Sequence, residues 1–144
     1  MSAPFWVLDT GALLAFAHGV DSVGQVLVDT ADAEATVMVP LICLIEAYGS
    51  LHNHEFELLQ ALRRNPAVVT VVPSIDVDHF DECPTLGVLA RLAGRLGAGH
   101  AAYVALTQAA GVITSRADQI HAALGDEWTV IEVDEARFTA FPGN

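Results

Sequence analysis

Two carboxylates in apolar surroundings are the residues of this chain best suited to chemistry. Asp9 directly follows the apolar run FWVL at 5–8, and Glu46 is the only charged residue in PLICLIEAYGSL at 40–51. A carboxylate buried without a partner is costly, so each side chain needs a hydrogen-bond donor or a cation. A divalent cation such as Mg²⁺ is one partner that carboxylate oxygens bind well.

Each carboxylate also has a purely structural interpretation. Asp9 could be only a cap or turn residue at the end of a strand, next to Thr10, whose hydroxyl can cap a helix. Glu46 could be a half-exposed helix residue. Asp118 has the clearest structural interpretation, because Ser115 and Asp118 have the S-x-x-D spacing of a capping box ahead of QIHAAL. These alternatives stay open at the level of sequence.

The elements that would position these residues follow from periodicity and from turn residues. Strands are predicted at 5–9, 36–39, 68–72, 111–115 and 128–133. Helices are predicted at 11–34, 41–51, 54–65, 76–95, 99–110 and 117–124. Strands that alternate with helices indicate an α/β fold, a three-layer α/β/α sandwich with a central parallel sheet covered on both faces.

Ligands bind to such sheets in the crevice outside the carboxyl ends of the strands. Asp9 follows the first predicted strand, and Thr114 lies at the end of the fourth. Glu46 lies in the second turn of the helix that follows the second strand. The predicted topology therefore places all three side chains at the same edge of the sheet.

Composition limits the class of protein. The 144 residues, 53% of them hydrophobic, suit a single domain, which we expect at 1–140 with a frayed tail at 141–144. The longest apolar run is about nine residues and no secretory signal opens the chain, so we expect a cytoplasmic protein without a membrane segment. Neither cysteine has the spacing of a zinc site or of a disulfide framework, and Cys43 is predicted to be a core thiol.

Charge limits the partners. All six basic residues are Arg, against 18 acidic residues, and the formal charge is −12. Such a surface repels phosphate backbones. Tight nucleic-acid binding by the chain alone is therefore not expected unless metal ions or a basic partner offset the charge.

Three segments together resemble a known family. FWVLDTGALLAF, PLICLIEAYGSL and GHAAYVALTQAAGVITSRAD are similar, in order and spacing, to the motif regions of PIN-domain nucleases, including VapC-type toxins of toxin–antitoxin pairs. The resemblance implies a PIN-like α/β/α fold that holds Mg²⁺ or Mn²⁺ and hydrolyses RNA phosphodiester bonds. It also implies a cognate antitoxin as partner and a homodimer. Asp9 matches the first acid of the family and Glu46 the second.

The chain departs from the family at the other two acids. His100 takes the place of the third, and in TSR the family's Thr is kept as Thr114 while Arg116 replaces the fourth acid. One Mg²⁺ needs only one or two carboxylates, whereas a neutral imidazole at position 100 would favour Mn²⁺ or a later metal. Arg116 would disfavour a second cation but could hold a phosphate oxygen of the substrate. Asp118 is a weak replacement ligand two residues late.

Two functions follow from this pattern. The leading hypothesis is a metal-dependent endoribonuclease in which Asp9, Glu46 and His100 hold the ion that activates water, with Thr114 positioning water or phosphate. The second is a catalytically degenerate PIN-like protein that binds RNA or protein without cutting. The string DTGA at 9–12 also resembles an aspartic protease turn, but the predicted helices exclude that all-β fold. Gly11 excludes the D-x-D motif of haloacid dehalogenase phosphatases.

Overall fold

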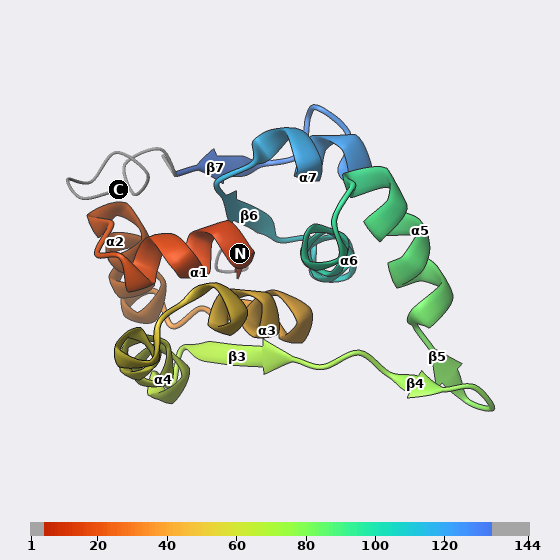
Figure 1. Cartoon of the computed structure of the whole chain (residues 1–144). Helices are drawn as coiled ribbons and strands as arrows, with labels where there is room; N and C mark the ends of the chain where they lie inside the picture. Colours follow the sequence, from red (N-terminus) through yellow and green to blue (C-terminus); the bar gives the residue numbers. More distant parts are fainter. Residues whose placement is uncertain (1–4, 134–144) are drawn as a thin grey trace.

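A five-stranded parallel sheet forms the centre of the protein. The computed structural model describes residues 5–133. The strands are β1 (Trp6–Leu8), β2 (Val37–Pro40), β3 (Val68–Val71), β6 (Gly111–Thr114) and β7 (Val130–Glu132), in the order β3-β2-β1-β6-β7 (Figure 1). All four pairings are parallel, which confirms the predicted sheet.

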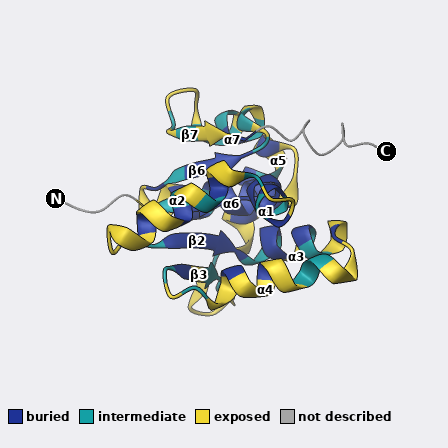
Figure 2. Ribbon diagram, turned by 90° about the vertical axis from the view of Figure 1, so that its left-hand side faces the viewer, coloured by how far each residue is buried: buried dark blue, intermediate teal, exposed yellow. Residues whose placement is uncertain are grey.

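Helices connect the strands and cover both faces of the sheet. They are α1 (Thr10–Ala17), α2 (Asp21–Asp32), α3 (Leu41–Ser50), α4 (Phe56–Arg64), α5 (Cys83–Ala93), α6 (Leu96–Gln108) and α7 (Ala117–Leu124), and a short 3₁₀ turn spans Asn53–Glu55. Exposed residues follow the outer faces of the helices, whereas the central strands are buried (Figure 2). The predicted three-layer α/β/α sandwich is confirmed.

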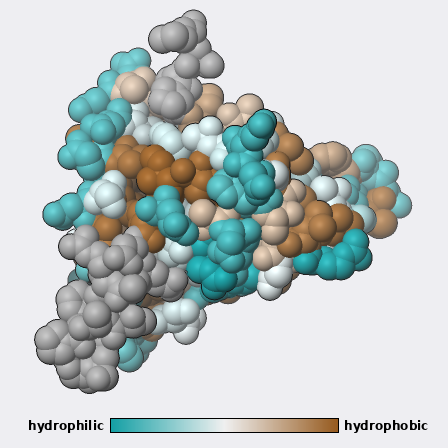
Figure 3. All heavy atoms as spheres, turned by 90° about the horizontal axis from the view of Figure 1, so that it is seen from above, coloured by the Kyte–Doolittle hydropathy of each residue, from teal (hydrophilic) through white to brown (hydrophobic). Residues whose placement is uncertain are grey.

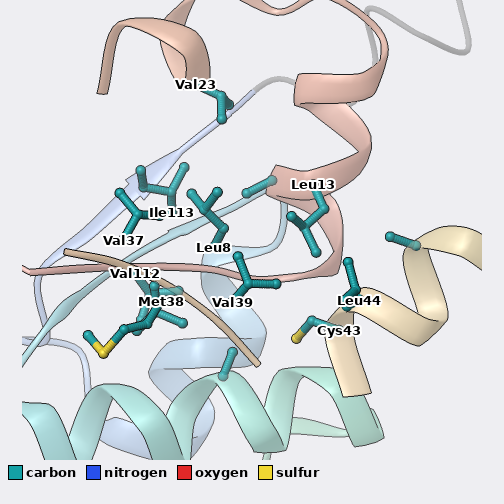
Figure 4. Close-up of a cluster of buried hydrophobic side chains, with 14 of the residues drawn as sticks. Leu8, Leu13, Val23, Val37, Met38, Val39, Cys43, Leu44, Val112 and Ile113 are labelled. Carbon is teal, nitrogen blue, oxygen red and sulfur yellow. The ribbon is translucent and has the colours of Figure 1, made fainter. Parts of the chain in front are cut away.

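The core lies between the sheet and the helices on its two faces. Val37, Val39 and Ile113 are among its fully buried side chains, and burial on both faces explains why these strands are continuous apolar runs. In Figure 4 the labelled side chains lie between the helices α1 and α2 on one side and α6 on the other. Cys43 belongs to this cluster as a buried free thiol, as predicted.

The predicted helix at 11–34 is two helices. The chain turns after α1 because Gly19 adopts a positive φ of 83°, a conformation that L side chains rarely adopt. The α6 helix also begins earlier than predicted, at Leu96, directly after a turn in which Gly94 has a φ of 84°. Both differences arise where a glycine lets the chain leave helical geometry.

The predicted helix at 76–95 is wrong over its first part. A small antiparallel hairpin replaces it, formed by β4 (Ile75–Asp76) and β5 (Phe80–Asp81), and α5 starts only at Cys83. Pro84 lies in the first turn of α5, where its missing N–H is not needed. In Figure 1 the hairpin lies at the lower right, beyond the main sheet.

No single helix within residues 5–133 is long and apolar enough to cross a membrane. Helices α1 and α2 reach the length and hydropathy of a membrane span only when they are counted as one segment, and they are bent by 104° relative to each other. The predicted tail at 141–144 lies outside the described residues.

Candidate functional site

The candidate site lies at the carboxyl edge of the three central strands. Asp9 follows β1, Glu46 lies on the helix that follows β2, and Thr114 ends β6. Because β2, β1 and β6 are adjacent in the sheet, the topology brings these three positions to one edge, as the sequence predicts.

Asp9 caps a helix and is almost completely buried. It is the N-cap of α1, and its Oδ1 accepts a hydrogen bond from the Ala12 amide at 3.0 Å. Burial raises the pKa of Asp9 from 3.8 to about 6, against the opposing effects of hydrogen bonds from Thr114 and Ala12 and of the positive charge of Arg95. The structural interpretation of Asp9 as a cap is therefore correct, and the positive charge of Arg95 also acts on the buried carboxyl.

Glu46 is joined to the residue next to Asp9. Its Oε1 accepts a hydrogen bond from the Thr10 hydroxyl at 2.7 Å, and its Oε2 accepts one from the Gly97 amide at 3.2 Å. The negative charges of Asp9 and Glu46 both contribute to a raised pKa of the Cys43 thiol, whose largest cause is burial. The two carboxylates predicted to share a site thus lie close to the same buried thiol.

Arg95 and Gly97 are the residues of this site that sequence reasoning missed. The Arg95 Nε lies 3.3 Å from Glu46 Oε1 and forms an ion pair with it. A Cβ at position 97 would overlap the same oxygen, so a larger residue there would require the Glu46 carboxylate to move. Both residues lie in LAGRLGAGH, where the run of glycines indicates a turn but carries no signal that one side chain reaches Glu46.

His100 faces a different part of the molecule. Its side chain is 1% exposed, and its Nδ1 accepts a hydrogen bond from the Ile42 amide at 3.3 Å. It lines a cavity of about 240 Å³ together with Phe80, Glu82 and Tyr103. Burial lowers the pKa of His100 to about 4, while the charge of Glu82 acts in the opposite direction.

His100 and Asp9 line different cavities, and no hydrogen bond among the described residues joins His100 to Asp9 or Glu46. Within the described residues, no group of three or more His, Cys, Asp or Glu side chains could hold a metal ion. The Nδ1 lone pair accepts the Ile42 N–H, so the proton of the neutral ring lies on Nε2, and a role of His100 as an ion ligand stays a prediction.

Arg116 and Asp118 pair with each other. The Arg116 Nε and Nη2 lie 3.1 and 2.9 Å from the two carboxylate oxygens of Asp118, and the Arg116 amide donates to Thr114 Oγ1 at 2.9 Å. The predicted capping box of Ser115 and Asp118 is wrong, because Arg116 is the N-cap residue of α7 and makes no side-chain capping bond. Asp118 is exposed, and both of its carboxylate oxygens accept hydrogen bonds from Arg116.

This arrangement does not fit Mg²⁺ or Mn²⁺. Both oxygens of Glu46 accept hydrogen bonds from the protein, and the Arg95 guanidinium already pairs with Oε1. A second positive charge there would be repelled by Arg95. The cavity that Asp9 and Arg95 line with Arg116 has a volume of about 10 Å³, roughly the space that one water molecule needs.

Comparisons with known proteins identify the fold. No family profile and no curated protein matches the sequence. Among solved structures, PAE2754 from Pyrobaculum aerophilum is similar with a TM-score of 0.59 and 15% identity, over 97% of this chain and 100% of that one. A chain of VapBC2 from Rickettsia felis, solved bound to a DNA fragment from its promoter, is similar with a TM-score of 0.61 and 18% identity, over 90% of this chain and 99% of that one.

VapC is a PIN-domain protein, so the likeness to a VapBC complex shows that the present chain has a PIN-like fold. At this level of identity the likeness concerns the fold alone. The function has to be argued from the residues at the carboxyl edge.

Proposed function

We propose that this chain is a PIN-like domain of the toxin type that works by binding a partner protein and does not cut RNA with a metal ion. The observation that carries the proposal is the ion pair between Arg95 and Glu46, 3.3 Å apart, in the place where the family resemblance implies a metal. Two of the four acids of the family are absent from the sequence, and the residues that replace them, His100 and Arg116, bind other groups.

Charge favours a protein over RNA as the partner. The formal charge of −12 opposes contact with a phosphate backbone unless a basic partner offsets it. The VapBC2 complex from Rickettsia felis was solved with DNA bound. By analogy, we propose an antitoxin-like partner in the cytoplasm that carries basic residues, which would neutralise the acidic surface of this chain.

The second candidate is the metal-dependent endoribonuclease. The hydrogen bond from Thr10 to Glu46 favours it, because this bond keeps Glu46 beside the residue next to Asp9 at the edge of the sheet where PIN-like enzymes act. In that function Mg²⁺ or Mn²⁺ would have to displace Arg95 from Glu46.

An RNA cleavage assay separates the two candidates. The purified chain is incubated with an RNA of mixed structure in Mg²⁺ or Mn²⁺ and in EDTA, with Asp9→Ala as the matched variant. We expect no difference between metal and EDTA and no gel shift of the RNA at physiological salt. Metal-dependent cleavage that disappears in Asp9→Ala would establish the nuclease instead.

Arg95 provides a second readout that does not depend on activity. Titration calorimetry with Mn²⁺ is expected to give no binding to the unmodified chain and measurable binding to Arg95→Ala, in which Glu46 has lost its internal cation. Arg91→Ala is the matched control, since Arg91 lies four residues earlier, on α5, and makes no ion pair with a described residue in the structure. Equal Mn²⁺ binding by the unmodified chain and by Arg95→Ala would contradict the role given to Arg95.

A partner that binds through charge should also copurify with the tagged chain at low salt. We expect a stoichiometric basic protein that dissociates as the salt concentration rises. A copurifying protein with a net negative charge would contradict the proposed chemistry of the partner.

A further inference from the structure

The hairpin of β4 and β5 exposes an unusual set of large apolar side chains. Val72, Ile75, Val77 and Phe80 are 64%, 73%, 79% and 60% exposed. An isolated two-stranded hairpin is only marginally stable in water, and each of these strands has only two residues. Apolar side chains gathered on a projecting element typically mark a surface that contacts another protein.

Each face of the hairpin carries an acidic side chain beside an apolar one, whereas the central strands of the main sheet are almost entirely apolar. In the register of the pair, Ile75 is opposite Asp81 and Asp76 is opposite Phe80, so apolar and acidic side chains occur on each face. Figure 3 shows the same mixture, with hydrophobic atoms among hydrophilic ones toward the right-hand end of the molecule, where the hairpin and α5 lie in Figure 1. The surface combines an apolar area with negative charge.

A cavity lies at the base of the hairpin, next to these exposed side chains. Phe80 and Glu82 line the cavity of about 240 Å³, and Pro73 and Val71 extend its apolar wall. Glu82 is held in place, since it accepts a hydrogen bond from the Ser74 amide at 2.7 Å. Its pKa is lowered, first by a hydrogen bond with Tyr103, which keeps the carboxylate ionised. The cavity thus has apolar walls and a fixed negative charge.

We propose that this surface, formed by residues 72–82, binds a segment of a partner protein that carries Lys or Arg beside large apolar side chains. Charge complementarity selects this occupant. Asp76, Asp78 and Asp81 lie on the hairpin, within a chain whose formal charge is −12. A second copy of the chain would bring like charges together, whereas a basic segment would pair with them and cover the apolar side chains.

The unpaired outer edges of the hairpin give such a segment a way to bind. Each strand of a two-stranded sheet pairs with a neighbour on one side only, so an extended peptide can add to the other side through main-chain hydrogen bonds. Alternating side chains of that peptide would place an apolar group on Ile75, with Val77 exposed in the adjacent turn, and positive charges near the aspartates.

Fluorescence anisotropy with a labelled peptide that alternates Lys and Val tests the inference. A peptide that alternates Glu and Val is the charge control. We expect the unmodified chain to bind the basic peptide and not the acidic one. Ile75→Ser/Val77→Ser should weaken binding by about tenfold or more, which corresponds to about 1.4 kcal/mol.

Val28→Ser/Leu58→Ser is the matched control, because it also replaces two exposed apolar side chains, on α2 and α4. It should leave binding unchanged, and thermal unfolding of both variants verifies that they are folded. Absence of binding by the unmodified chain, or equal weakening in both variants, would overturn the inference. A dimer of the unmodified chain that becomes monomeric only in Ile75→Ser/Val77→Ser would show that a second copy covers the hairpin.

The inference rests on the proposed function in assuming a protein partner, but the two tests fail separately. Metal-dependent RNA cleavage would overturn the proposed function without affecting peptide binding. If the basic peptide does not bind, the argument from the ion pair between Arg95 and Glu46 is unchanged.

Discussion

Asp9 and His100 are two buried titratable residues whose burial has opposite consequences for stability. Burial disfavours the charged form of each, so it raises the pKa of Asp9 to about 6 and lowers that of His100 to about 4. The folded protein therefore binds a proton at Asp9 more readily than the unfolded chain does, and one at His100 less readily. At neutral pH, burial therefore disfavours the ionised Asp9 but is compatible with the neutral imidazole of His100.

The sign of each effect gives a prediction for pH. Asp9 contributes most to stability below pH 3.8, and this contribution is lost as the pH rises to about 6, whereas the contribution of His100 is lost as the pH falls from 6.5 to about 4. Asp9→Asn should raise the free energy of unfolding at pH 7.5 by on the order of 1–3 kcal/mol, and this gain should shrink toward pH 4. His100→Gln should gain stability relative to the unmodified chain as the pH falls from 6.5 to 4.

Urea unfolding of both variants between pH 4 and pH 7.5 measures these differences. Asparagine can still accept the Ala12 N–H, and glutamine can still accept the Ile42 N–H, so each variant keeps the local hydrogen bond. A difference between Asp9→Asn and the unmodified chain that does not vary with pH would contradict the argument from burial.

At the scale of elements, the start of α6 determines what the site can hold. Gly97, the second residue of this helix, donates its amide N–H to Glu46, and Arg95 is the residue immediately before the helix. One short turn between α5 and α6 thus supplies both an N–H and a positive charge to a carboxylate on α3. The pairing depends on how close α6 packs to α3, and the absence of a Cβ at position 97 permits that approach.

Two glycine substitutions test this packing. Gly97→Ala should lower the free energy of unfolding by about 1–2 kcal/mol, because the new methyl group displaces the Glu46 carboxylate from Thr10 and Gly97. Gly49→Ala is the control within α3 itself. A Cβ at position 49 meets nothing within 4 Å, so the better helix propensity of alanine should stabilise the protein by about 0.5–1 kcal/mol. Chemical denaturation measures both, and stabilisation by Gly97→Ala would contradict the close approach.

At the scale of the whole molecule, the acidic charge opposes the compact state. Ion pairs such as Arg95–Glu46 and Arg116–Asp118 offset only a small part of the excess of acidic residues. Repulsion among the remaining carboxylates destabilises the folded chain, and dissolved salt screens that repulsion. The same negative charge would attract a basic partner protein.

Thermal unfolding should therefore depend on ionic strength. Raising NaCl from low to moderate concentration should raise Tm by about 2–5 °C, because screened repulsion outweighs the weakening of the few ion pairs. Chloride is the suitable anion, since sulfate also strengthens apolar burial. An unchanged or lower Tm, measured by circular dichroism, would show that local pairs dominate over the net charge.

The sequence by itself determined the sheet and the first two residues of the site. Strands such as VMVP and GVIT are apolar or nearly so over their whole length, and parallel strands buried on both faces require such a composition. Asp9 and Glu46 could be located because a polar residue that ends an apolar strand, or interrupts an apolar helix, is visible in one dimension. The homodimer, the antitoxin and the metal remain predictions.

The tertiary structure alone decided which groups these residues meet. The contacts of Arg95 with Glu46 and of His100 with Ile42 join residues 49 and 58 positions apart, and side-chain direction across packed helices cannot be read from local periodicity. The hairpin at 75–81 was hidden for a related reason, since its short strands are too brief to show a period of two and precede a strongly periodic helix. The local pattern of apolar and polar residues was enough to predict the strands and most helices of the sheet's frame. The groups that Glu46 and His100 contact were decided by packing between residues far apart in the sequence.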